Sequence, residues 1–225
     1  MAPINLQGLP QIVTAIGGLG TAAFGLVDAS KVLWGGVNHI GFSAIKATVI
    51  TLTPAGGAQQ APVNALSQQK ILATLQANWF NGIDLGGQKA IAKSLIKLNL
   101  NAGNAAALAA ATGVDSDMLA SVATSIAAGT TLTPAQSDVF ARFDLIVTAL
   151  LDEAYQRGDQ AYKNGTRILA MLISLGLAYF GCAVTGQGPF VFLLVGLLAT
   201  PLAPIAKDLS TALSTAVNTM QLVKK

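Results

Sequence analysis

The sequence is poor in charge, since only 10% of its 225 residues are Asp, Glu, Lys or Arg. Soluble domains usually carry about 25% charged residues, so this composition favours a membrane protein. The formal net charge is only +3, and no cluster of Lys and Arg alternates with aromatic residues as it would in a nucleic-acid-binding face. We therefore expect no nucleic-acid partner.

Cysteine and histidine are also nearly absent. One cysteine, Cys182, and one histidine, His39, exclude an intrachain disulfide and a Cys/His metal set. No nucleophile elbow, zinc-protease pair or Walker lysine motif occurs. Asp152 and Glu153 are adjacent, so on a helix they would point about 100° apart, which suits an acid–base pair poorly. We expect no catalytic residue, no metal and no cofactor, and we predict that the chain is not an enzyme.

One short motif points to a different class of protein. Residues 18–23 (GLGTAA) fit the G-x-G-x-x-A pattern of dinucleotide-binding folds. That pattern also needs an acidic residue about 20 residues later to bind the ribose, and Asn38 and His39 stand there instead. Because the rest of the chain has helical patterns, a dinucleotide-binding module is the least favoured interpretation.

The sequence contains a long uncharged run near its C-terminal end. Residues 168–206 contain no Asp, Glu, Lys or Arg, and a breaker at 185–188 (TGQG) divides them into two apolar halves. Each half would form a helix about 26 Å long, at the short end of what crosses a bilayer core of about 30 Å. Neither half has the polar face of a soluble helix. We predict a transmembrane hairpin over residues 163–206; the alternative is two buried helices of a soluble core.

The first 27 residues are likewise uncharged. Residues 10–27 are apolar and small, and they predict a membrane helix within an N-terminal membrane or interfacial segment, 1–53. Small residues repeated every four positions let membrane helices approach closely. The candidate helix-packing residues with this spacing are Gly17, Thr21, Gly25 and Ala29.

Residues 32–53 leave several interpretations open. They are apolar but contain Asn38, His39 and Lys46. Three placements fit this composition: a continuation of the first helix, a segment at the membrane surface, or a segment that re-enters the membrane. The β-branched run 48–51 is also compatible with a short strand.

Residues 54–162 predict a helical and mostly soluble module. Its clearest start signal is 133–136 (TPAQ), with a capping Thr, a Pro at the first helical position and a Gln at the third. Lys89, Lys93 and Lys97 recur every four residues on one face of a predicted helix. Such a face suits the surface of an anionic membrane; the alternative is a solvated charged face that packs on a helical bundle.

The ends of the predicted spans carry the remaining candidate polar pairs, Asp28, Lys207 and Asp208. Residues 207–225 predict a weakly charged amphipathic helix. Because basic residues favour the cytoplasmic side, we expect the N-terminus outside and both the central module and the C-terminus inside, in a membrane of the bacterial inner-membrane type.

The sequence thus predicts an all-α integral membrane protein with an N-terminal membrane helix, a central helical module and a C-terminal transmembrane hairpin. A homo-oligomer with a structural or scaffold role fits best, because three spans with small-residue faces suit self-association better than enclosing a path. The alternative is an oligomeric channel or pore subunit. The expected partners are membrane lipid, further copies of the chain and other protein subunits.

Overall fold

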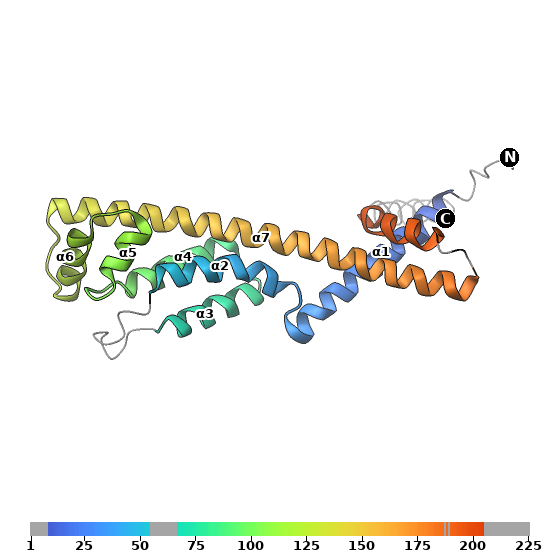
Figure 1. Cartoon of the computed structure of the whole chain (residues 1–225), viewed down its shortest axis with the longest axis horizontal. Coiled ribbons are helices and arrows are strands. Elements are labelled where there is room, and N and C mark those ends of the chain that lie inside the picture. Colours follow the sequence, from blue (N-terminus) through green and yellow to red (C-terminus); the bar gives the residue numbers. More distant parts are fainter. Residues whose placement is uncertain (1–8, 55–66, 187, 189, 205–225) are drawn as a thin grey trace, which may run out of the picture. The chain divides into compact units, whose positions relative to one another are not determined.

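The computed structural model describes residues 9–54, 67–186, 188 and 190–204, and no β-strand occurs among them. The prediction of an all-helical fold is confirmed. The helices are α1 (Leu9–Trp34), α2 (Asn38–Leu52), α3 (Gln68–Phe80), α4 (Leu85–Leu98), α5 (Ala105–Thr112), α6 (Ser116–Ala127) and α7 (Pro134–Thr185), followed by a short apolar helix, Phe190–Pro204 (Figure 1). The GLGTAA motif lies inside α1, where no strand-to-helix turn exists for a dinucleotide phosphate.

The chain divides into two compact units. The apolar unit consists of Met1–Val37 and Lys163–Lys225, and the central unit is Asn38–Tyr162. Helix α7 contributes residues to both.

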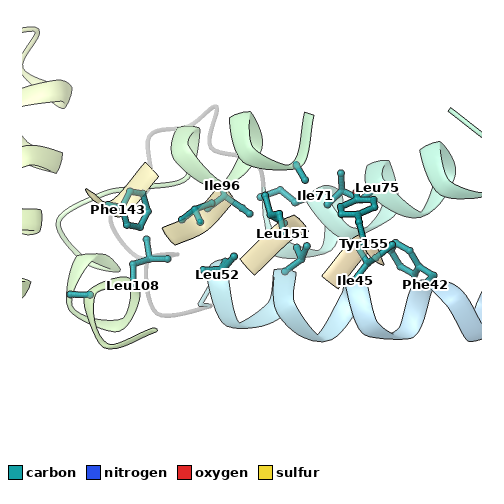
Figure 2. Packing of buried hydrophobic residues seen from close by; sticks show 14 of the residues in the cluster. Phe42, Ile45, Leu52, Ile71, Leu75, Ile96, Leu108, Phe143, Leu151 and Tyr155 are labelled. Atoms are coloured by element: carbon teal, nitrogen blue, oxygen red, sulfur yellow. The ribbon is translucent and has the colours of Figure 1, made fainter. Parts of the chain in front are cut away.

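The central unit has one hydrophobic core built from the apolar faces of its helices. Each buried Leu or Ile contributes roughly 1.5–3 kcal/mol relative to an exposed one. The labelled side chains in Figure 2 meet in this core: Phe42, Ile45 and Leu52 of α2, Ile71 and Leu75 of α3, Ile96 of α4, Leu108 of α5, and Phe143, Leu151 and Tyr155 of α7. Burial raises the pKa of Tyr155 to about 12.

Helix α2 corrects one sequence-based expectation. The strand at residues 48–51 is wrong, because these residues lie in the last turn of α2. Its buried side chains are Phe42, Ile45, Val49 and Leu52, and this spacing of three and four places them on one helical face. Helix α2 therefore packs in the central unit, Asn38–Tyr162.

The start of α7 confirms the predicted capping signal. The Thr133 N–H donates to the Gln136 side-chain oxygen (2.8 Å), and the Gln136 N–H donates to the Thr133 hydroxyl (3.3 Å). The Gln136 amide also donates to the hydroxyls of Ser121 (2.8 Å) and Ser125 (3.1 Å), which ties this end of α7 to α6. From Pro134 the helix runs unbroken through Gly158 to Thr185.

Two glycines allow α2 and α7 to meet at backbone distance. A Cβ atom added to Gly41 would lie 2.9 Å from the Gly158 carbonyl oxygen and 2.5 Å from the Trp79 ring. A Cβ atom added to Gly158 would lie 2.8 Å from the Gly41 carbonyl oxygen. Real Cβ atoms do not approach this closely, so glycine is required at both positions. The Trp79 indole N–H donates to the Asn38 carbonyl (3.0 Å), which fixes the start of α2 beside α3.

Candidate functional site: the helices of the apolar unit

The outer surface of the apolar unit carries many large apolar side chains. On α7, Ile168 and Leu172 are each 60% exposed and Val184 is 87% exposed. The same holds on the other two helical segments, where the exposed residues include Ile12, Leu26, Leu33 and Trp34 of α1 and Phe190, Leu193, Leu194 and Leu197 of the Phe190–Pro204 helix. Exposed large apolar side chains gathered on one unit of a protein indicate a site of contact with a protein or a membrane.

The interior of the apolar unit is formed by small side chains. A Cβ atom on Gly20 would overlap the Ala199 carbonyl oxygen, and one on Gly196 would lie 2.8 Å from the Leu175 Cα. The other buried residues of the three helical segments are also mostly small: Gly17, Ala23, Val27, Ser30, Ala170, Ser174, Ala178, Ala199 and Ala203. The rings of Tyr179 and Phe192 pack edge to face, with centroids 5.5 Å apart. Small residues inside and large apolar residues outside are typical of helices packed in lipid.

Two helices are long and apolar enough to cross a membrane: α1 over Ile12–Trp34 and α7, Pro134–Thr185. The first has 23 residues, which corresponds to about 34 Å, slightly more than a bilayer core of about 30 Å. The Phe190–Pro204 helix is apolar but shorter. Length and composition therefore permit a membrane location.

The predicted packing residues of α1 have different surroundings. Gly17 is buried, whereas Thr21, Gly25 and Ala29 are exposed. The Thr21 hydroxyl donates to the Gly17 carbonyl (3.1 Å), so it has a partner within its own helix. Contacts inside the unit use Gly20 and its neighbours on another face of α1, and packing of the predicted residues against a second molecule stays a prediction.

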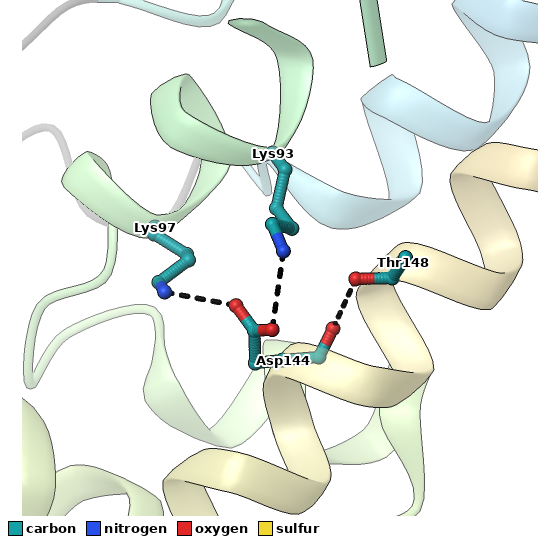
Figure 3. Close-up of polar contacts among 4 residues, drawn as sticks. All are labelled: Lys93, Lys97, Asp144 and Thr148. Atoms are coloured by element: carbon teal, nitrogen blue, oxygen red, sulfur yellow. Dashed lines mark hydrogen bonds and ion pairs between the residues drawn. The ribbon is translucent and has the colours of Figure 1, made fainter. Parts of the chain in front are cut away.

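The three predicted surface lysines of α4 all meet carboxylates of α7. Lys93 and Lys97 donate to the two oxygens of Asp144, at 3.2 Å and 2.8 Å (Figure 3), and Lys89 donates to Asp152 at 2.5 Å. The Lys97 ammonium also lies 4.9 Å from the centre of the Phe140 ring. This arrangement matches the charged face packing on a bundle that the sequence left as an alternative; contact with lipid stays a prediction.

Asp144→Asn is expected to destabilise the central unit by about 1 kcal/mol at neutral pH, the scale of a partly exposed ion pair. The hydrogen bond from Lys97, more than any other group, lowers the pKa of Asp144, and partial burial opposes this effect. Because the pKa is lower in the folded state, the stabilisation is complete above the unfolded value of about 3.9 and is lost as the pH falls through the lowered value. Thermal midpoints of wild type and variant should therefore differ at pH 7 and converge in acid. A difference that persists in strong acid would contradict the ion-pair explanation.

The remaining polar candidates lie near the end of α1 or outside the described residues. The Lys31 ammonium lies 2.6 Å from the Asp28 carboxylate, one helical turn apart. Lys207 and Asp208 lie outside the described residues, as does the predicted amphipathic helix 207–225.

Within the described part of the chain, no three His, Cys, Asp or Glu side chains gather into a possible metal site. A cavity of about 470 Å³ lies between the end of α4 and α6, and its lining, which includes Leu98, Leu100, Ala123 and Ile126, contains no ionisable side chain. His39 packs edge to face on Phe80. No known protein family, curated protein or solved structure matches this chain.

Proposed function

We propose that this chain is an integral membrane protein with a structural, self-assembling role. Helix α1 and the apolar end of α7 enter the membrane, and α7 and Phe190–Pro204 form a hairpin with its tip at 185–188. The central unit lies outside the bilayer on the cytoplasmic side.

The observation that carries this proposal is that the apolar unit has small side chains inside and large apolar side chains outside, the opposite of a soluble protein. Exposed apolar surface costs roughly 25 cal/mol per Å² in water, and Leu172, Val184 and Phe190 are all mostly exposed. In lipid the same surface costs nothing, and close contacts at Gly20 and Gly196 supply the packing that holds membrane helices together.

A structural role is supported by where the polar groups lie. The strongest charged cluster, Lys93 and Lys97 with Asp144, joins two helices of the central unit. An ion-pair cluster of this kind holds helices together and needs no substrate to account for it.

A channel formed by several copies is the second candidate. It is favoured by three hydroxyl groups of the apolar unit, on Thr166, Ser174 and Thr200, that are buried with no hydrogen-bond partner. A buried hydroxyl without a partner costs free energy, and water entering the unit would remove that cost. Conductance or solute flux across liposomes that contain the purified protein distinguishes a channel from a scaffold.

Membrane fractionation of the full-length protein tests the proposal. The protein should sediment with membranes at high speed, remain there after extraction at alkaline pH, and dissolve only in detergent. In gentle detergent it should elute as an oligomer. A full-length product that stays in the supernatant without detergent overturns the membrane assignment. Protease added to sealed right-side-out vesicles should leave the central unit intact. Digestion of the central unit would contradict the proposed orientation.

A further inference from the structure

The central unit has a cavity of about 470 Å³ between the end of α4, the turn at residues 99–103 and α6. Small-molecule sites usually measure about 300–1,000 Å³ and have mainly apolar walls with a few polar groups. The walls of this cavity include Leu100, Ala123, Leu98 and Ile126. The last two are 71% and 49% exposed, so a ligand seated against them would remove apolar surface from water, which favours binding.

The wall formed by the turn is fixed by a network of asparagine side chains. The amides of Asn101 and Asn104 both donate to the Asn99 carbonyl, at 3.0 Å and 2.7 Å. The side-chain oxygen of Asn104 accepts from the Asn101 N–H (2.8 Å), and that of Asn101 accepts from the Gly103 N–H (2.9 Å). A ligand therefore meets a preformed wall, and less conformational entropy is lost on binding.

Hydrogen-bond acceptors are available at the cavity. Helix α4 ends at Leu98 and α6 ends at Ala127, and the last carbonyls of a helix have no partner within it. In the described part of the chain, the carbonyls of Leu98 and Ala127 accept no hydrogen bond, and the side-chain amide of Asn99 makes none. All three residues line the cavity. Because unpaired carbonyls give a helix end a partial negative charge, a ligand group that donates a hydrogen bond is favoured here.

The chemistry of the lining disfavours a charged ligand. None of the described residues that line the cavity is an Asp, Glu, Lys, Arg or His. An ionised group that enters a mainly apolar cavity loses hydration, and no opposite charge in the lining compensates for the loss.

We propose that this cavity binds a small uncharged molecule with an apolar body and one hydroxyl or amide N–H group. The apolar body lies against Leu98 and Ile126, and the donor group meets the carbonyl of Leu98 or Ala127. The site belongs to the central unit alone, so this inference does not depend on the proposed membrane location.

Protection of an introduced thiol tests the site, with phenethyl alcohol as the probe. In a Cys182→Ala background, Thr124→Cys places a thiol in the cavity wall, and Leu145→Cys is the exposed control elsewhere in the central unit. The measurement is the rate of alkylation by a maleimide in the detergent-solubilised full chain. Saturating probe should slow alkylation several-fold at position 124 and leave it unchanged at position 145. No slowing at position 124, or equal slowing at both positions, overturns the inference.

Three analogues of similar size test the chemical class of the ligand. Phenethylammonium and hydrocinnamate each carry a charge, and phenethyl methyl ether lacks the donor group. At equal free concentration, each should protect position 124 several-fold less than phenethyl alcohol does. An ion that protects as well as the alcohol contradicts an uncharged ligand, and an ether that does so contradicts the donor contact.

Filling the cavity tests where the probe binds. Ala127 is exposed and lines the cavity, so Ala127→Phe places a ring there without entering the core of the unit. Ala110→Phe is the matched control, because Ala110 is exposed on α5 and is not part of the lining. In the chain with Thr124→Cys, Ala127→Phe should abolish protection by phenethyl alcohol, whereas Ala110→Phe should retain it. Protection that survives Ala127→Phe, or that is lost equally in both variants, shows that the probe does not occupy this cavity.

Discussion

Replacing Gly158 by alanine is expected to destabilise the central unit by about 2–3 kcal/mol, the cost of forcing a methyl group into a close-packed contact. The new Cβ atom would lie 2.8 Å from the Gly41 carbonyl oxygen and 3.3 Å from the Ile45 side chain. The nearest atom is backbone, so α2 and α7 must separate to accommodate the methyl group. Gly41→Ala should have a similar effect, because its Cβ atom would meet the Trp79 ring and the Gly158 carbonyl.

Gly86→Ala is the matched control for this prediction. Gly86 lies in α4, and an added Cβ atom would come no closer than 3.9 Å to the Asp84 carboxylate. Alanine has a higher helix propensity than glycine by up to about 1 kcal/mol, so this variant should be neutral or slightly stabilised. The measurement is the thermal midpoint of the detergent-solubilised protein, followed by circular dichroism. Equal midpoints for Gly158→Ala and Gly86→Ala would show that α2 and α7 do not meet at the glycine pair.

Local signals of the sequence predicted helix ends well. The side chains of Thr133 and Gln136 cap the residues beside them, so their role depends only on spacing. The residue that follows α5, Gly113, has a φ of 66°, which glycine adopts at no steric cost, so one residue accounts for the end of this helix. Such signals are complete within a few residues and need no knowledge of the fold.

Features that depend on distant residues were less predictable. The sequence of α2 resembled a membrane or interfacial segment because its outward face is only weakly polar. Its position in the core of the central unit depends on the helices that cover Ile45 and Val49, which the local sequence does not indicate. The partner of Lys93 and Lys97 is Asp144, about fifty residues further on. In α1, small residues occur on every face, so the sequence alone cannot tell which face the other helices occupy. Among the described residues, Gly20 faces Ala199 and Ala203, whereas a Cβ atom added to Gly25 would have no atom within 4 Å.

A charge introduced at Leu172 is expected to have the largest effect of all the changes considered. Leu172 is 60% exposed on the apolar part of α7, and in the proposed location its side chain faces lipid. An aspartate within a membrane helix costs up to about 3 kcal/mol for insertion, which is roughly a hundredfold shift in the equilibrium. Leu172→Asp should therefore move much of the protein out of the alkaline-resistant membrane fraction.

Leu145→Asp is the decisive control, because Leu145 lies on the same helix, is 70% exposed and belongs to the central unit. Both variants add the same charge at an exposed leucine of α7, and both carry the same loss of helix propensity. If both parts of α7 are in water, the two variants should behave alike, since an exposed apolar side chain in water is replaced by a charge at little cost. If only the later part is in lipid, Leu145→Asp should fractionate as wild type while Leu172→Asp does not. Equal recovery of the two variants in the membrane fraction would contradict a lipid-facing Leu172, and the exposed apolar surface would then have to be covered by protein.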